Sequence, residues 1–340
     1  MILLKSKYLK WLLLATSLAV LLLVSVFISL TSGELNIGLT RALKLLFAGA
    51  DKDSVEYMLI SQVRMPRIIL GLAVGGALSL SGVILQGIYR NPLVEPYTLG
   101  ISGGASLGVA FTIVFGLHLK YGGIMLPLSG FLGAFLIIFL VYTLGSRGGG
   151  KVKVQNMLLT GVMVSFVASS GMMLLMSLSS TEKLHGIIFW TMGSLDQSDN
   201  LLIWITLIVS LIGLFASYLF VRPLNALRLG EEKALHLGIN TGIAIKSLFL
   251  IASLLAGVCV SVAGVIGFVG LIIPHLLRLV FGSDYRILLV SSFLLGGSFI
   301  VLSDVVARTI IAPNELPIGV ITGIIGGSVF IVMMNSRKRR

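Results

Sequence analysis

Residues Arg222–Asn240 read RPLNALRLGEEKALHLGIN, a charged amphipathic stretch between two long apolar runs. Pro223 suits the first turn of a helix, Gly230 interrupts the pattern, and Gly238 suits a helix end. Glu231 would lie in the first turn of a second helix, where a carboxylate is favourable against the helix dipole. The stretch therefore predicts two short helices at a membrane surface. A solvated loop with partial helical character remains the alternative, since such stretches are common beside membranes.

The composition excludes an ordinary soluble domain, because the mean hydropathy is +1.06, 56% of the residues are hydrophobic and 11% are charged. A membrane-crossing helix needs about 20 apolar residues. The first such run exceeds the roughly 7–15 residues of a signal-peptide core, so we interpret it as a retained span. We expect one all-α polytopic domain over residues 1–340 with ten transmembrane spans: Trp11–Leu30, Ile68–Ile88, Leu99–Leu117, Ile124–Leu144, Gln155–Leu178, Leu201–Val221, Thr241–Ile266, Val269–Phe281, Ile287–Ala307 and Leu316–Met334.

The basic residues agree with this topology. When ten spans alternate in direction, 17 of the 25 Lys and Arg residues fall on the side of both termini and 8 fall on the other side. Because cytoplasmic loops carry the excess of positive residues, both termini are predicted to be cytoplasmic and an even number of spans is favoured. The same rule accounts for the net charge of +12 without a nucleic-acid partner.

Small residues recur along several predicted spans. Glycines spaced by four let helices approach closely, either within the chain or between subunits. Closely spaced glycines before Pro274 predict a break between the seventh and eighth spans. Apolar patterns also predict a short interfacial helix near Ala42–Ala48 and an interfacial segment at Ile187–Met192. The glycines are Gly71, Gly75, Gly100, Gly104, Gly108, Gly319, Gly323 and Gly327 on the helix faces, and Gly264, Gly267 and Gly270 at the break.

Signals for nucleotide or metal binding are weak. Gly145–Lys151 (GSRGGGK) resembles a phosphate-binding loop, but Val152 stands where Ser or Thr must reach magnesium, and no soluble strand precedes the loop. The four histidines show no metal-binding spacing. Acidic residues are nearly absent from the span interiors, whereas an ion-coupled carrier usually needs buried ionisable groups. We therefore expect no catalytic residue, metal or cofactor in this chain, and energy supplied from elsewhere.

Three arginines lie on the predicted outer side, against the positive-inside trend: Arg64, Arg67 and Arg308. One interpretation is that they anchor span ends by snorkelling to the interface. The other is that they are fixed positive points for an acidic partner, because a guanidinium pairs with a carboxylate in a bidentate way. The residues alone leave both interpretations open.

Seven stretches, in this order, resemble the FecCD-type permease family of bacterial ABC importers, which includes cobalamin, haem and ferric-siderophore permeases. Each is weak alone, but the combination is specific and runs from the second span to the C-terminus. The first span and the loop after it match only in length and polarity. The stretches are Arg64–Arg67 (RMPR), Gly82–Gly100 (GVILQGIYRNPLVEPYTLG), Gly193–Leu195 (GSL), Gly230–Gly238 (GEEKALHLG), Gly267–Arg278 (GFVGLIIPHLLR), Asp304–Arg308 (DVVAR) and Glu315–Gly319 (ELPIG).

The resemblance implies a type II, BtuC-like ABC importer permease. Its relatives form a homodimer of about twenty spans with a pathway along the dimer axis. Two separate ATPase subunits, which hold ATP and magnesium, dock beneath it on the loop at Arg222–Asn240. A substrate-binding protein docks on the extracytoplasmic side. The location implied is a bacterial cell membrane, with the protein crossing the bilayer many times.

The resemblance also assigns roles to residues. Arg64, Arg67 and Arg308 correspond to arginines that pair with glutamates of the binding protein, which favours the docking interpretation. Asn91, Pro92 and Leu93 correspond to a cytoplasmic gate; otherwise they would be only a proline-bounded turn. The hairpin over residues 145–155 occupies the place of a second gate segment, without diagnostic residues. Contact with the ATPase falls on Arg228, Gly230, Glu231, Glu232, Ala234, Leu235 and Gly238.

The sequence thus predicts the permease subunit of an ATP-driven importer for a metal chelate, most simply a ferric siderophore, because siderophore permeases are the most numerous in the family. Haem or cobalamin is the alternative within the family. A carrier that works without a motor is the alternative from another class. No residue in the chain identifies the chelate.

Overall fold

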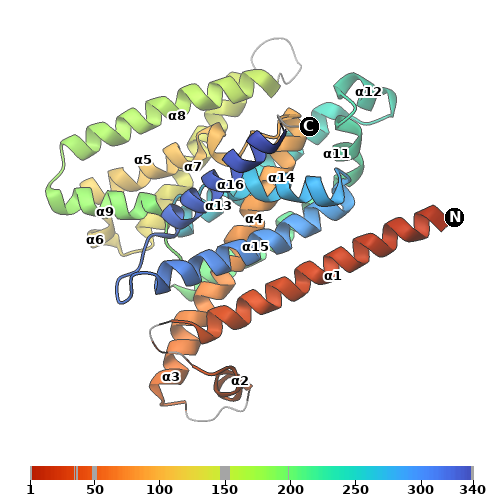
Figure 1. Ribbon diagram of the computed structural model, residues 1–340. Helices are drawn as coiled ribbons and strands as arrows, with labels where there is room; N and C mark the ends of the chain where they lie inside the picture. The colour runs from red at the N-terminus through yellow and green to blue at the C-terminus, as the bar shows by residue number, and fades with distance from the viewer. Residues whose placement is uncertain are drawn as a thin grey trace.

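The computed structural model describes residues 2–33, 35, 37–47, 52–145, 154–197 and 199–337, and within these ranges the chain is helical and contains no strand. Each of the ten predicted spans contains a helix, and the helices form one bundle (Figure 1). Seven are long and apolar enough to cross a membrane, and α5, α14 and α16 are shorter apolar helices. The ten are α1 (Ile2–Thr31), α4 (Met65–Tyr89), α5 (Ile101–Val114), α7 (Met125–Gly145), α8 (Val154–Ser177), α10 (Asn200–Leu219), α13 (Thr241–Ala263), α14 (Val269–Phe281), α15 (Tyr285–Thr309) and α16 (Ile318–Arg337).

Helix α4 is the centre of the bundle. The most apolar window of the helix that contains it is 89% buried, against 11% for α1 and for α8. Helices α10, α13, α14 and α15 all pack on α4. Glycine makes this possible: a Cβ atom on Gly82 would lie 1.9 Å from the carbonyl oxygen of Gly270 in α14. Another on Gly75 would lie 2.2 Å from the carbonyl oxygen of Gly296 in α15.

The bundle has two ends of different character. Both termini and the short helices α11 (Val221–Leu227) and α12 (Glu231–His236) lie at one end, which we name the α12 end (Figure 1). Helices α2 (Leu39–Phe47), α3 (Val55–Met58), α6 (Leu117–Tyr121) and α9 (Thr181–Met192) lie at the other, which we name the arginine end. Ten apolar helices occur among the described residues, and the two marked ends of the chain both lie at the α12 end. That this end faces the cytoplasm stays a prediction.

The smaller predicted elements are present where the structure describes them. Helix α2 contains the predicted interfacial helix up to Phe47. The apolar segment Ile187–Met192 forms the second half of α9. The predicted break after the seventh span is a turn between Ala263 and Val269. Phe268 in this turn has φ +70°, a conformation uncommon for residues other than glycine. The basic loop over residues 146–153 lies outside the described residues. It holds most of the stretch that resembles a phosphate-binding loop and most of the second gate segment that the family resemblance implies.

The glycine faces divide into two kinds. Those of α4 and α5 are packing seams within the chain, since a Cβ atom on Gly104 would lie 2.5 Å from the carbonyl oxygen of Gly133 in α7. On α16, a Cβ atom on Gly319 would lie 2.3 Å from the carbonyl oxygen of Met192, whereas one on Gly323 would meet no heavy atom within 4 Å. Large apolar side chains are exposed around it, including Ile324 at 63%. Helix α8 has a similar exposed face, with Phe166 at 68%.

Candidate functional site

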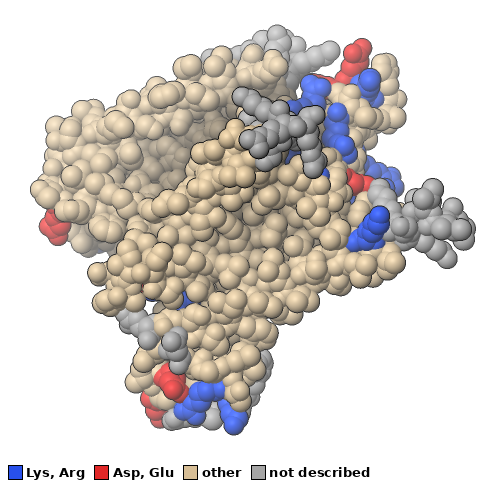
Figure 2. All heavy atoms as spheres, viewed as in Figure 1, with Lys and Arg blue, Asp and Glu red and all other residues tan. Residues whose placement is uncertain are grey.

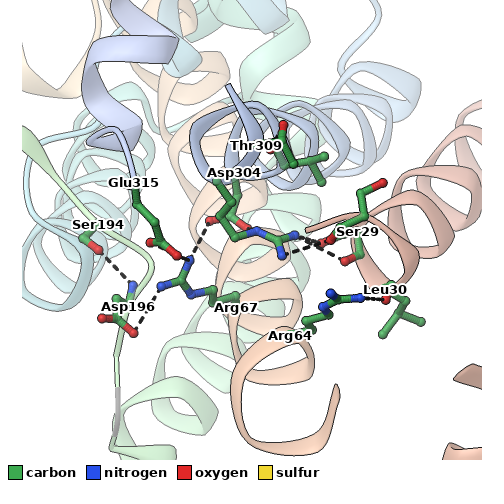
Figure 3. Close-up of polar contacts among 12 residues, drawn as sticks. Ser29, Leu30, Arg64, Arg67, Ser194, Asp196, Asp304, Thr309 and Glu315 are labelled. Carbon is green, nitrogen blue, oxygen red and sulfur yellow. Dashed lines mark hydrogen bonds and ion pairs between the residues drawn. The ribbon is translucent and has the colours of Figure 1, made fainter. Parts of the chain in front are cut away.

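Arg64 and Arg67 lie near each other at the arginine end (Figure 3), and Arg308 shares Asp304 with Arg67. We name these three residues the arginine cluster. The π-helical turn η1 (Leu59–Arg64) and α4 carry the first two, and α15 carries the third. Their exposed fractions are 2%, 7% and 8%. A charge buried this deeply requires partners, because an unpaired buried charge is costly. The chain covers all three side chains, and their role in docking stays a prediction.

Arg67 is held by carboxylates from three other segments. Its guanidinium lies 2.8 Å from Glu315 Oε2, 3.3 Å from Asp196 Oδ1 and 3.9 Å from Asp304 Oδ1. The Asp304 side chain, on α15, is 7% exposed. The side chains of Asp196 and Glu315, on connecting loops, are 74% and 48% exposed. Figure 3 shows the loop carboxylates on the side of Arg67 away from α1, so this guanidinium has one buried and two exposed counter-ions.

Arg308 and Arg64 bind the last turn of α1. Arg308 pairs with Asp304 one turn earlier at 2.9 Å and donates a hydrogen bond to Ser29 Oγ at 2.9 Å. Arg64 donates to the carbonyl oxygen of Leu30 and to one carbonyl in the loop beyond it. With the three carboxylates around Arg67 included, three positive groups face three negative ones. The cluster is therefore balanced in charge and joins α1, α4, α15 and two loops.

The loops that carry Asp196 and Glu315 are also fixed by backbone hydrogen bonds. The Ser194 N–H donates to the carbonyl oxygen of Ala263 at 2.9 Å. The N–H of the first residue of α16 donates to the carbonyl oxygen of Gly193 at 3.2 Å. These bonds hold the loop backbones independently of the carboxylates, so the two side chains can change partner without release of the loops.

At the α12 end, the predicted pair of short helices is confirmed, and the solvated-loop alternative is wrong. Helices α11 and α12 are separated at Gly230 (φ +110°), and Gly238 (φ +77°) follows the end of α12. Both residues have positive φ, which only glycine adopts without strain. Glu231 and Glu232 form the first turn of α12, as the helix dipole favours.

The helix pair is attached by its inner side and open on its outer side. Ala234 is fully buried, whereas Leu235 is 51% exposed and Leu237 is 62% exposed. Arg228 Nη1 donates to the carbonyl oxygen of Ser283 at 2.6 Å, in the turn between α14 and α15. A partner could therefore cover the outer side of α12 without breaking these attachments.

The predicted gate turn lies at the same end. Arg90 ends α4 in the left-handed region with φ 49°, and the turn at Asn91, Pro92 and Leu93 follows. Asn91 Oδ1 accepts a hydrogen bond from the Leu93 N–H at 3.0 Å. Pro92 and Arg228 line one cavity of about 230 Å³. The structure thus brings the gate turn and the helix pair together, and places the arginine cluster at the opposite end. The roles of both sets stay predictions.

Two polar features were missed by reasoning from the sequence. Burial raises the pKa of the Glu95 carboxyl, in the turn between α4 and α5, and a hydrogen bond from the Phe268 backbone opposes this rise. Gln86 in α4 accepts a hydrogen bond from Arg278 and donates one to the carbonyl oxygen of Gly270 at 3.0 Å. The signal in the sequence was a polar residue inside an apolar run, but its partners lie far away along the chain.

The partners of Arg67 were missed as well, although both stood beside recognised stretches. Glu315 opens the ELPIG stretch, and Asp196 directly follows the GSL stretch. Charged side chains otherwise gather at the two ends of the face shown in Figure 2, and the surface between them is almost free of Lys, Arg, Asp and Glu. Such a band is expected where lipid tails contact a protein, because charges are expensive in the bilayer. This chain is a multi-pass membrane protein.

Comparisons with known proteins agree with this geometry. A sequence model described as the FecCD transport family matches residues 21–336. The hemin transport system permease protein HmuU of Yersinia pestis is 35% identical over 94% of this chain and 96% of its own length. The vitamin B12 import system permease protein BtuC of Klebsiella pneumoniae is 36% identical over 95% of this chain and 93% of its own. A solved structure described as an inward-facing metal-chelate type ABC transporter matches with a TM-score of 0.81 and 32% identity, over 96% of this chain and 99% of that one.

Proposed function

The chain belongs to the FecCD transport family of ABC transporter permeases, and we propose that it is the membrane-spanning subunit of an ATP-driven, binding-protein-dependent importer for a ferric siderophore. ATP and magnesium are bound and used by a separate ATPase, and this chain holds no cofactor. Both termini and the α12 end face the cytoplasm, and the arginine end faces the binding protein.

The observation that carries this proposal is the helix pair α11–α12. Leu229, Leu235 and Leu237 are 58%, 51% and 62% exposed at the α12 end of the bundle, which the proposed topology puts outside the lipid tails. Clustered exposed apolar side chains outside the membrane mark a protein contact. The neighbouring glutamates and Lys233 supply a polar rim, as protein interfaces commonly have. This surface therefore suits a soluble motor subunit.

The exposed faces of α8 and α16 support a homodimer. Helix α16 combines an open Gly323 with exposed Ile324 and Ile331, and α8 exposes Phe166 and Val167. Small residues beside large apolar ones permit close helix contact in a membrane. A second copy of this chain would cover these faces, and the pathway would run between the two copies.

The substrate is the least constrained part of the proposal. The similarity to the hemin and vitamin B12 permeases favours a large chelate in general, and haem or cobalamin is the second candidate for that reason. Among the described residues, no group of three His, Cys, Asp or Glu side chains could hold a metal ion.

Reconstitution tests the proposal. The chain is placed in vesicles with the ATPase and a substrate-binding protein of its source organism, and uptake and ATP hydrolysis are measured with ferric siderophores, haem and cobalamin. Stimulation by one loaded binding protein is expected, and the chelate that gives it identifies the substrate. Uptake that needs no ATPase would overturn the proposal and favour a carrier without a motor.

A further inference from the structure

The arginine cluster is buried and already paired, which conflicts with a role in receiving carboxylates of a partner. A binding protein that docks through carboxylates needs a guanidinium to receive them, yet Arg67 is 7% exposed and already faces three carboxylates of its own chain. Its Nη1 atom alone lies within 2.9 Å of both Glu315 oxygens. No further carboxylate can approach this side of Arg67 while Glu315 and Asp196 remain there.

Resting on the proposed function, we propose that docking at the arginine end is an exchange. Asp196 and Glu315, which we name the loop carboxylates, occupy on Arg67 the places that two carboxylates of the binding protein take when it docks. The structure thus corresponds to the undocked state, in which carboxylates of the same chain pair with Arg67. The partner surface this requires is acidic and projecting, because it must reach a side chain that the loops partly cover.

The exposure of the three carboxylates determines which of them exchange. The Asp304 side chain is 7% exposed and also pairs with Arg308 at 2.9 Å, so it stays in place as the permanent counter-ion. The loop carboxylates are 74% and 48% exposed, so each can turn from Arg67 into water without burying its own charge. Arg67 itself cannot be left unpaired, since an uncompensated buried charge is strongly unfavourable. During the exchange Arg67 stays paired, because Asp304 remains beside it while the other carboxylates change.

Exchange also links docking to the helices on either side. Asp196 lies between α9 and α10, and Glu315 lies between α15 and α16, so through Arg67 they connect two loops that are far apart in the sequence. When both turn away, this side-chain connection is lost, while the backbone hydrogen bonds between Ser194 and Ala263 remain. When the partner is bound, the two loops are therefore no longer linked through Arg67, and their backbone hydrogen bonds still hold them.

The test uses the substrate-binding protein that stimulates transport in the reconstitution above, labelled with a fluorophore and titrated onto the chain in nanodiscs. In the double variant Asp196→Asn/Glu315→Gln the competing charges are absent and the shapes are kept. We expect the dissociation constant to fall about tenfold, with more of the effect from Glu315→Gln than from Asp196→Asn, because Glu315 is the closer of the two. The matched control is Glu56→Gln, which removes an exposed carboxylate from an ion pair at the same end (Arg41–Glu56, 2.7 Å) and should change the constant less than twofold.

The outcomes separate the two proposals. Unchanged or weaker binding by the double variant overturns the exchange, and weaker binding shows instead that the loop carboxylates receive basic side chains of the partner. An equal effect of Glu56→Gln also overturns it, since net charge alone would then be responsible. If the unaltered chain forms no complex with any binding protein, the proposed function fails and the exchange fails with it. If the complex forms but is insensitive to the loop carboxylates, only the exchange fails.

Discussion

The two ends of the bundle use charge in opposite ways. At the arginine end, three cations are buried and each is bound by groups from elsewhere in the chain. At the α12 end, the charged side chains Glu232 and Lys233 are exposed, and apolar Leu235 and Leu237 stand beside them. The α12 end is thus ready to receive a partner by addition, whereas the arginine end must first give up internal contacts. The predicted docking residues at the arginine end are therefore part of the internal packing, whereas those on the outer side of α12 are exposed.

The largest effect expected from this comparison is on folding stability at the arginine end. Arg67→Ala leaves buried Asp304 without one of its two cations and removes the connection between the loops. The free energy of unfolding should fall by about 3–5 kcal/mol, the usual effect of breaking a buried ion pair. Thermal unfolding in detergent measures it. Arg41→Ala, at an exposed pair of the same end, should cost only about 0–1 kcal/mol. Equal losses would remove the distinction between buried and exposed charge.

The second prediction concerns the helix that joins the two ends. Gly82→Ala would place a methyl group 1.9 Å from the carbonyl oxygen of Gly270, so α4 and α14 must move apart. We expect a loss of about 1–3 kcal/mol, typical of overpacking. Gly323→Ala on α16 meets no atom of its own chain and should change unfolding by less than about 0.5 kcal/mol. A strong effect of Gly323→Ala on subunit association but not on unfolding would support the second copy proposed there.

The third prediction concerns partner affinity at the α12 end. Leu235→Glu places a charge on the exposed side of α12 and should weaken association with the ATPase about tenfold, as the loss of a central apolar contact does. The matched control is Leu119→Glu, which adds the same charge at an 81% exposed leucine of the arginine end. Co-purification of the ATPase is the measurement, with unfolding temperature as the check on the fold. If both variants lose the ATPase equally, the α12 end is not its contact surface.

Local patterns in the sequence were sufficient for most of the fold. Val269–Phe281 was predicted to the residue, because Gly267 stands just before this apolar run and Gly282 ends it. The predicted span Leu99–Leu117 is shorter in the structure, since Gly100 (φ +84°) and Gly116 (φ +65°) confine α5 between them. The start of the second span was missed: α3, η1 and α4 form one continuous helix from Val55, and its early polar residues concealed this.

The site was predictable only where its chemistry is local. Two glycines and a pair of glutamates within Arg222–Asn240 are enough to predict two short helices. The burial of Arg67 could not be predicted from neighbouring residues, because its partner Glu315 is 248 residues away along the chain. A stretch such as RMPR gives the residue type and its side of the membrane, but not which groups elsewhere in the chain bind it.

That distance has a consequence for how the protein is made. Arg64 and Arg67 leave the ribosome well before Asp304, Arg308 and Glu315. At synthesis rates of about 5–20 residues per second, 248 residues take roughly 10 to 50 s. During that interval Arg67 lacks Asp304 and Glu315, although its third counter-ion, Asp196, is made earlier. Synthesis of α15 and of the loop that carries Glu315 completes its ion pairs. The complete arginine cluster can therefore form only after α15 and the loop at Glu315 have been made, and a chain truncated before α15 would lack it.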